Sequence, residues 1–348
     1  MSVNRVVATC RALDDGRALR LALLDDIGRV VGFDAHAWLL TDPETEVGSA
    51  PLAAVPSLAD LPRLIRLRYL TSLNRWTTLA DPPVASLRRA TAADPSRSAD
   101  PWPALLSSYG VADVASTVFR DPFGCWGFLD LWRMGAAFAP RELDFLAAIA
   151  PAVTEALRRC QARTFAATEG TPLRSGPVVL VLSAGLEVRA QTAETDGYLR
   201  ALVPPDGGAS PVPAGAYNVA AQLLAREAGV DGHAAWARVH AGGGAWLTLR
   251  AARVGGAGDL SPGDGGGDVA VTIERASPAE RRALFGRAHG LSAREAELVD
   301  HLARGADTRE TARAMFVSEH TVQDHLKSIF AKTGARSRRT LLARLAGP

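Results

Sequence analysis

The chain has 348 residues, of which 47% are hydrophobic, and its formal net charge is only +2. This length allows two or three domains with real cores, and the near-neutral balance excludes a protein that coats nucleic acid with its whole surface. Three scattered cysteines exclude a disulfide framework and a zinc site, so we expect a cytoplasmic protein without metal or other cofactor. No run of 18 apolar residues occurs, so we expect no membrane span.

Helical and strand-like patterns alternate along residues 1–165, which predicts one mixed α/β domain. Turn residues at 120–124 separate two β-rich runs and predict a hairpin. The long C-terminal helix of this domain has apolar residues every three to four positions, and it is a candidate for pairing between protomers. The predicted elements are helices over 17–31, 61–73 and 140–165, and strands over 33–40, 113–119 and 126–132.

A polar segment over 166–176 is predicted to be a linker, and a second α/β unit follows over 177–276. Its glycine-rich piece at 255–267 is predicted to be a loop, because it lacks the strand–loop–helix context of a phosphate-binding loop. The predicted elements are strands over 178–183, 186–190, 233–240, 245–253 and 268–274, and helices over 196–202 and 218–228. This order is typical of a PAS-like domain, whereas the order in 1–165 is typical of a GAF-like domain.

After a second predicted linker over 277–289, the start and stop signals of helices become clear. Four tightly linked helices in fewer than 60 residues predict an all-α unit over 290–348, so the fold class is a multidomain α+β protein. Its signals are capping boxes at Ser292/Glu295 and Asp307/Glu310, caps at Ser318 and Ser337, and glycine stops at Gly305 and Gly334.

The third of these helices, over 319–332, has one apolar and one polar face. Val322, Leu326, Ile329 and Phe330 have the spacing of a buried stripe, which turns the remaining positions outward. From 319 to 344 six basic residues stand against two acidic ones, so positive charge is concentrated here. Small hydrogen-bonding side chains suit the major groove of DNA. The outward positions are His320, Gln323, Asp324, Lys327 and Ala331.

A solvated basic face could also belong to a helical docking or dimerisation module. A family resemblance favours DNA binding over this alternative. The run 317–326, with its fixed spacing to Lys332 and Gly334, resembles the LuxR-type (GerE-like) helix-turn-helix. The resemblance covers about 55 residues and implies a transcription regulator. It also implies that Gln323, Asp324 and Lys327 face bases, and that phosphates are approached by Ser318, Thr321, Lys332, Arg336 and Arg338.

The groove face departs from the family pattern at Gln323, where the family usually has a lysine. With Asp324 beside it, this face is less cationic than usual, which leaves the base preference open and predicts weaker non-specific binding. His325 is expected to pack and hydrogen-bond at the base of the helix rather than read a base.

The first 280 residues are expected to be an input region. The sequence argues against a phosphoacceptor receiver, because such a domain needs a lysine on a late strand and neither lysine of the chain precedes position 327. Segments 33–43 and 119–128 resemble the GAF-type part of some actinobacterial LuxR-type regulators, which implies a pocket for a small molecule or partner, or a dimerisation platform. The candidate pocket residues are His36, Trp38, Tyr69, Trp76, Cys125 and Trp126, although each is also a plausible core residue.

No motif of a hydrolase, metalloprotease, kinase or P-loop enzyme occurs, so we expect no enzymatic activity. The resulting prediction is a transcription regulator that binds double-stranded DNA as a homodimer. A small-molecule effector and RNA polymerase are further candidate partners. The alternative is a GAF/PAS sensor whose C-terminal bundle docks onto proteins.

Overall fold

The computed structural model describes residues 3–166, 178–202, 211–255 and 267–347. The chain forms two compact units. The first comprises Met1–Leu157, Leu173–Val239 and Leu247–Glu274, and the second comprises Arg158–Pro172, His240–Trp246 and Arg275–Pro348. In the described parts of the chain, every helix is too short or too polar to cross a membrane.

The first unit contains two five-stranded sheets, and the first of them has the order β2-β1-β5-β4-β3. The long hairpin of β4 and β5 forms where it was predicted, with Asp121 paired to Gly124 at its end. All the strand pairs of this sheet are antiparallel. The strands are β1 (Ala35–Thr41), β2 (Gly48–Ala54), β3 (Val84–Ser86), β4 (Val111–Asp121) and β5 (Gly124–Met134).

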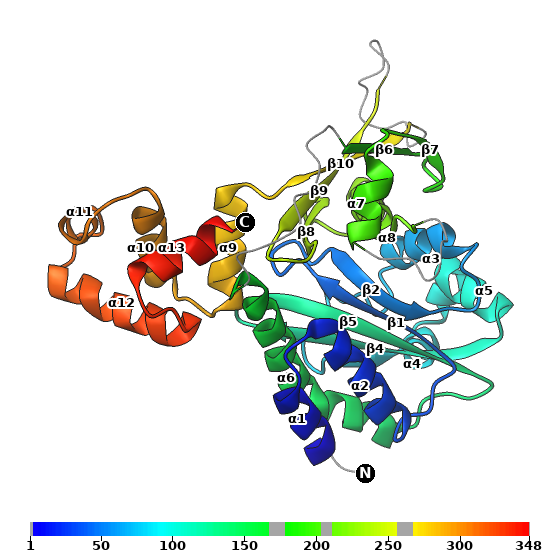
Figure 1. Ribbon diagram of the computed structural model, residues 1–348. Helices are drawn as coiled ribbons and strands as arrows, with labels where there is room; N and C mark the ends of the chain where they lie inside the picture. Colours follow the sequence, from blue (N-terminus) through cyan, green and yellow to red (C-terminus); the bar gives the residue numbers. More distant parts are fainter. Residues whose placement is uncertain (1–2, 167–177, 203–210, 256–266, 348) are drawn as a thin grey trace. The chain divides into compact units, whose positions relative to one another are not determined.

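Helices cover both faces of this sheet (Figure 1). On one side lie α1 (Val3–Ala12), α2 (Gly16–Gly28) and α6 (Pro140–Arg163), and on the other lie α3 (Leu61–Leu70) and α5 (Pro101–Ser108). The short elements α4 (Leu87–Ala93) and η1 (Pro95–Ala99) precede α5. Asp15 caps α2 through hydrogen bonds from two backbone N–H groups, and Pro62 stands in the first turn of α3.

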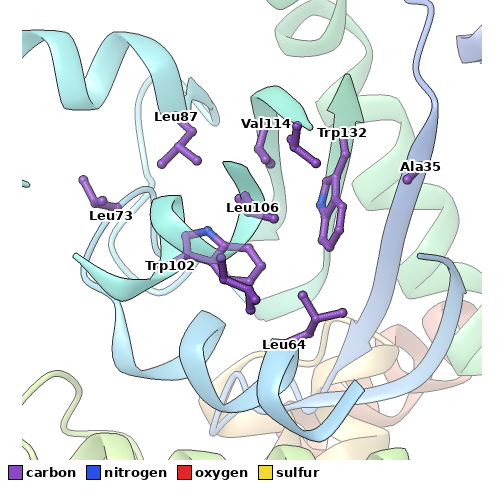
Figure 2. Packing of buried hydrophobic residues seen from close by; sticks show 10 residues of the cluster. Ala35, Leu64, Leu73, Leu87, Trp102, Leu106, Val114 and Trp132 are labelled. Atoms are coloured by element: carbon purple, nitrogen blue, oxygen red, sulfur yellow. The ribbon is translucent and has the colours of Figure 1, made fainter. Parts of the chain in front are cut away.

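A cluster of large side chains fills the space between α3, α5 and the sheet (Figure 2). Trp102 of α5 meets Trp132 of β5 edge to face, with 6.0 Å between the ring centroids. Leu64 of α3 and Leu106 of α5 belong to the same cluster. This core fixes both helices on the sheet, and it lies beside the cavity considered further below.

The apolar stripe of α6 is used inside the protein. Leu143, Leu146, Ile149 and Val153 are all buried, as their helical spacing predicts. The stripe is therefore covered by this chain and does not offer a free apolar face to a second protomer. The expectation that this helix pairs between protomers stays a prediction, and such pairing would use a face of α6 other than this stripe.

The second sheet has the order β7-β6-β10-β9-β8. Its strands are β6 (Val178–Leu182), β7 (Val188–Gln191), β8 (Trp236–His240), β9 (Trp246–Arg253) and β10 (Val269–Arg275), and its helices are α7 (Thr195–Leu202) and α8 (Ala214–Glu227). Each of these elements lies where the sequence predicts one. The predicted linker 166–176 and loop 255–267 fall almost wholly outside the described residues.

The two sheets belong to one compact unit because α8 and two buried ion pairs connect them. Helix α8 contacts α3 and β2 of the first sheet, and its many buried alanines allow a close approach. Arg75 pairs with Asp231 at 2.6 Å, and Arg238 pairs with Asp42 at 2.7 Å, with all four side chains at most 2% exposed. The two predicted domains therefore share a polar, fully buried junction.

The second unit is helical. It contains η2 (Thr164–Ala166), α9 (Pro278–Ala288), α10 (Ala293–Ala303), α11 (Thr308–Ala314), α12 (Glu319–Thr333) and α13 (Arg338–Ala346). Residues 277–289, predicted as a linker, form α9 instead. The helix begins with a capping box between Ser277 and Glu280, has Pro278 at its start, and buries Leu284 and Phe285. Phe285 meets Phe165 edge to face at 5.3 Å.

Candidate nucleic-acid interface

Helices α11 and α12 form a helix-turn-helix. Helix α11 begins with a capping box in which Asp307 and Glu310 accept hydrogen bonds from each other's backbone N–H groups, both at 2.8 Å. Met315 ends α11 and is buried, which anchors the turn. Phe316 follows with a φ of 55° and a side chain that is 94% exposed. The left-handed backbone at Phe316 reverses the chain direction before α12.

Sequence-encoded caps fix both ends of α12. The Ser318 hydroxyl accepts a hydrogen bond from the Thr321 N–H at 3.1 Å, and the two hydroxyl groups lie 2.9 Å apart. Gly334 ends the helix in the left-handed conformation, with a φ of 65°. Both caps are confirmed as predicted. Since Ser318 and Thr321 bond to each other, each would contact a phosphate only with its remaining hydrogen-bonding capacity.

The two faces of α12 are also as predicted. Val322, Leu326 and Ile329 are buried, and Phe330 is half-buried beside them. The opposite face is exposed at every predicted position, namely His320, Gln323, Asp324, Lys327 and Ala331. His325 is half-buried, in keeping with the expectation that it does not read a base.

The charges at the centre of the exposed face neutralise one another. Lys327 Nζ lies 3.0 Å from Asp324 Oδ1, and His320 Nε2 lies 3.5 Å from Asp324 Oδ2. The hydrogen bond from Lys327 and its positive charge lower the pKa of Asp324. These groups are exposed, so their attraction is weak enough to be exchanged for contacts with bases.

Lys332 has a partner inside the domain. Its Nζ lies 2.6 Å from Oε2 of Glu295, and the Ser328 hydroxyl donates to Oε1 of the same carboxylate at 2.6 Å. Burial disfavours the charged carboxylate, but these hydrogen bonds and that from the Ser292 N–H outweigh it and lower the pKa of Glu295 to about 2. Lys332 thus ties α12 to the start of α10, and its predicted phosphate contact would compete with this ion pair.

Two of the other basic side chains are also structural. Arg338 donates a hydrogen bond to the carbonyl of Ala306, and Arg344 donates to the carbonyl of Thr333. Arg336 and Arg339 are exposed. Of the two arginines predicted to contact phosphate, Arg336 is exposed and available for such a contact. Arg338 is already engaged in a hydrogen bond to the segment between α10 and α11.

Of the six candidate pocket residues, Tyr69 lines the cavity described in the first unit, and the other five do not. Strand β1 places His36 and Trp38 on the face opposite to Ala37 and Leu39, and only the latter two line a cavity of about 200 Å³ in the first unit. Tyr69 lines this cavity too. The other candidates do not line it, and most of them have partners within the fold.

Trp38 stacks on Phe119, with 5.4 Å between the centroids. Trp76 donates to the carbonyl of Glu46, and Trp126 donates to the Asp121 carboxylate. The Cys125 thiol is buried, and burial raises its pKa to about 11. The sequence interpretation missed Arg68, Trp102, Asp130 and Trp132, which do line the cavity. Strand alternation in 126–132 was the signal that groups Phe128, Asp130 and Trp132 on one face.

Comparison with known proteins assigns the helical domain. The family model described as "Bacterial regulatory proteins, luxR family" matches residues 289–345. The crystal structure of Escherichia coli SdiA aligns over 99% of this chain and 95% of its own, with 11% sequence identity and a TM-score of 0.36. A search of curated proteins gave no match. Residues 289–345 are therefore a LuxR-family helix-turn-helix domain.

Proposed function

We propose that the protein is a transcription regulator that binds duplex DNA by inserting α12 into the major groove. The observation that carries this proposal is the exposed polar face of α12 on a capped helix-turn-helix of the LuxR family. Gln323 has the two groups that pair with adenine, Asp324 accepts from cytosine, and Lys327 donates to guanine or to a phosphate. Arg336, with Ser318 and Thr321, would hold the phosphate backbone, and Lys332 and Arg338 would stiffen the domain behind it.

We infer that the protein acts as a homodimer on an inverted repeat. One small helical domain buries too little DNA surface for tight and specific binding, and two copies related by a twofold axis read two half-sites. The half-sites would lie about 10 base pairs apart, or a multiple of this, from centre to centre. Since the stripe of α6 is buried, dimer contacts would use other surfaces.

We also infer that the first unit is the input region. A signal there would change the fraction of the protein that is competent to bind DNA. The buried junction between the two sheets makes the unit a single responsive body rather than two independent sensors.

Selection of bound duplexes from a random library by the full chain tests the proposal. The expected result is an enriched inverted repeat, bound at least 10³-fold more tightly than random duplex at physiological salt. Gln323→Ala should relax one position in each half-site, whereas Arg309→Ala, an exposed change on α11 outside the groove face, should leave the base preference unchanged. If no sequence is enriched, the proposal fails, and the alternative of a protein-docking module is favoured.

A further inference from the structure

Helix α11 ends in a hydrogen-bonded cap that has a phenylalanine where glycine is usual. The N–H of Phe316 donates to the carbonyl of Arg313 at 3.2 Å, and the N–H of Val317 donates to the carbonyl of Ala312 at 3.0 Å. These two bonds define a Schellman motif, in which the residue after the cap is left-handed. Phe316 is that residue, with a φ of 55°. A bulky side chain is strained in this conformation, because its Cβ lies too close to the following carbonyl oxygen.

The chain closes three other helices with the same pair of backbone hydrogen bonds, and at each of them it uses glycine. Helices α8, α9 and α10 end in this way, with donor–acceptor distances of 2.8–3.1 Å. The left-handed residues are Gly229, Gly290 and Gly305, with φ angles of 68°, 62° and 89°. The cap itself therefore needs no side chain. Phe316 departs from this pattern at the helix that directly precedes α12.

The fold does not use the Phe316 ring. The side chain is 94% exposed, so burial does not offset the strain of its backbone. All other exposed large hydrophobic side chains of the described residues belong to the first unit. Backbone strain that the surrounding structure does not repay is concentrated at functional sites. The ring therefore points to a contact outside this chain.

The surroundings of Phe316 indicate what that contact is. A protein interface has a core of several apolar side chains, whereas this ring is flanked along the chain by polar and charged residues. In a helix-turn-helix, the first helix crosses the DNA backbone and the start of the second enters the major groove, so the turn between them faces the backbone. That backbone alternates anionic phosphates with deoxyribose rings, which present apolar carbons. The exposed neighbours are Arg313, Ser318, Glu319 and His320.

We infer that the Phe316 ring packs on a deoxyribose of the DNA backbone, beside the phosphate that Ser318 and Thr321 approach. The inference rests on the proposed function and adds a positioning residue to the same interface. The contact is apolar, so it reads no base and releases no counterion. Its role is to fix how deeply, and at what angle, α12 enters the groove.

Phe316→Gly in the full chain tests the inference, because it gives α11 the cap of α8, α9 and α10 and removes the ring. Hydrogen exchange should show α11 and α12 at least as well protected as in the parent, since the strain is relieved. Binding should weaken about tenfold on the selected inverted repeat and on random duplex alike, which corresponds to about 60 Å² of apolar surface. The salt slope should stay that of the parent, whereas Arg336→Ala should reduce it.

A graded variant and a control separate the ring from the backbone. Phe316→Leu keeps an apolar side chain on the strained residue and should lose about two- to fourfold in affinity. Gly305→Ala places a Cβ on the left-handed residue that caps α10, where it would meet no atom within 4 Å. It should lower the exchange protection of α10 through strain alone and leave the DNA affinity within about threefold of the parent. Unchanged protection of α10 would refute the strain argument.

Hydroxyl-radical cleavage of the bound duplex locates the contact, because these radicals attack the deoxyribose. The parent should protect one or two sugars at one edge of each half-site that Phe316→Gly leaves open, with the rest of the footprint unchanged. Equal affinity of Phe316→Gly and the parent, an unchanged footprint, or lower exchange protection of α11 in the variant overturns the inference. A parent that selects no duplex overturns the proposed function as well, whereas a parent and a variant that bind the selected duplex equally overturn only the role of Phe316.

Discussion

Lys332, in the last turn of α12, and Glu295, in the first turn of α10, form an ion pair with 2.6 Å between Nζ and Oε2. The carboxylate is 4% exposed and also completes the capping box of α10. One acidic side chain thus fixes the start of one helix and the position of the recognition helix relative to it. The stability of the DNA-binding domain should therefore depend on the ionisation of Glu295.

The pH dependence follows from the direction of the shift. The pKa of Glu295 is lowered from 4.5 to about 2 in the folded protein, so its stabilisation is complete above pH 4.5 and is lost as the pH falls from 4.5 to 2. Glu295→Gln should destabilise α10 and α12 by about 2–3 kcal/mol at pH 7 and by much less near pH 3. Hydrogen exchange of these helices, compared with the parent at each pH, measures the difference.

Glu310→Gln provides the control, because Glu310 closes the capping box of α11 but is exposed. It should cost less than about 1 kcal/mol at pH 7, because an exposed cap is lost without a buried ion pair. Equal pH profiles for the two variants would contradict the role assigned to the Lys332 ion pair.

Asp324 should limit non-specific DNA binding. Its carboxylate holds both Lys327 and His320, so Asp324→Asn would release Lys327 toward the phosphates and remove a negative charge from the groove face. We expect tighter binding to random duplex and a logarithmic salt slope steeper by about 0.9 for each cation released. Binding across a series of salt concentrations measures this. Glu297→Gln, the same change of charge on α10, should leave the slope unchanged, and an equal effect would point to net charge alone.

Lys327→Ala and Arg336→Ala should weaken DNA binding in different ways. Loss of Lys327 should cost about 1–3 kcal/mol at the preferred site and change the base preference, because it removes a contact to a base edge. Loss of Arg336 should weaken all sequences alike and reduce the salt slope by about 0.9. Competition between selected and random duplexes separates these outcomes. Identical losses on both duplexes for both variants would refute the division of roles.

Removal of one buried positive charge, that of Arg75, should destabilise the junction between the two sheets of the first unit. Arg75 donates to the Asp231 carboxylate, to Gln222 and to the Tyr69 carbonyl, and Arg75→Met would leave these acceptors buried. We expect a loss of about 3–5 kcal/mol, measured by urea unfolding. Arg97→Met breaks a pair with Asp94 in which both side chains are nearly half exposed, and it should cost less than about 1 kcal/mol. A similar small loss for Arg75→Met would show that the junction is dispensable.

Local signals predicted the helical domain more completely than the cavity. The caps at Ser318 and Gly334 and the stripe of Val322, Leu326 and Ile329 depend on residues within one helix, so spacing alone locates them. Helix α9 carried the same capping signal at Ser277 and Glu280, yet its arginine-rich sequence was interpreted as a linker. Residues of the cavity come from several strands and helices that are distant in sequence, and their convergence depends on tertiary packing.

Asn218 illustrates this limit. The predicted helix begins at Asn218, and asparagine is common at the start of a helix. In the structure α8 begins at Ala214, so Asn218 lies inside the buried part of the helix. A shift of four residues in one boundary therefore places Asn218 within the helix, where it is fully buried.

The helical unit is assembled from three separate stretches of the chain, Arg158–Pro172, His240–Trp246 and Arg275–Pro348. Phe165 stacks on Trp246 at 5.5 Å, and Arg281 of α9 donates to the carbonyls of Gly244 and Leu345, so all three stretches contribute to its interior. No single truncation releases this unit intact. A fragment that starts at 290 would expose the inner side of α10 and α13, and one that starts at 275 would still lack both aromatic rings. Biochemical dissection of this protein is therefore better done by substitution in the whole polypeptide than by cutting it.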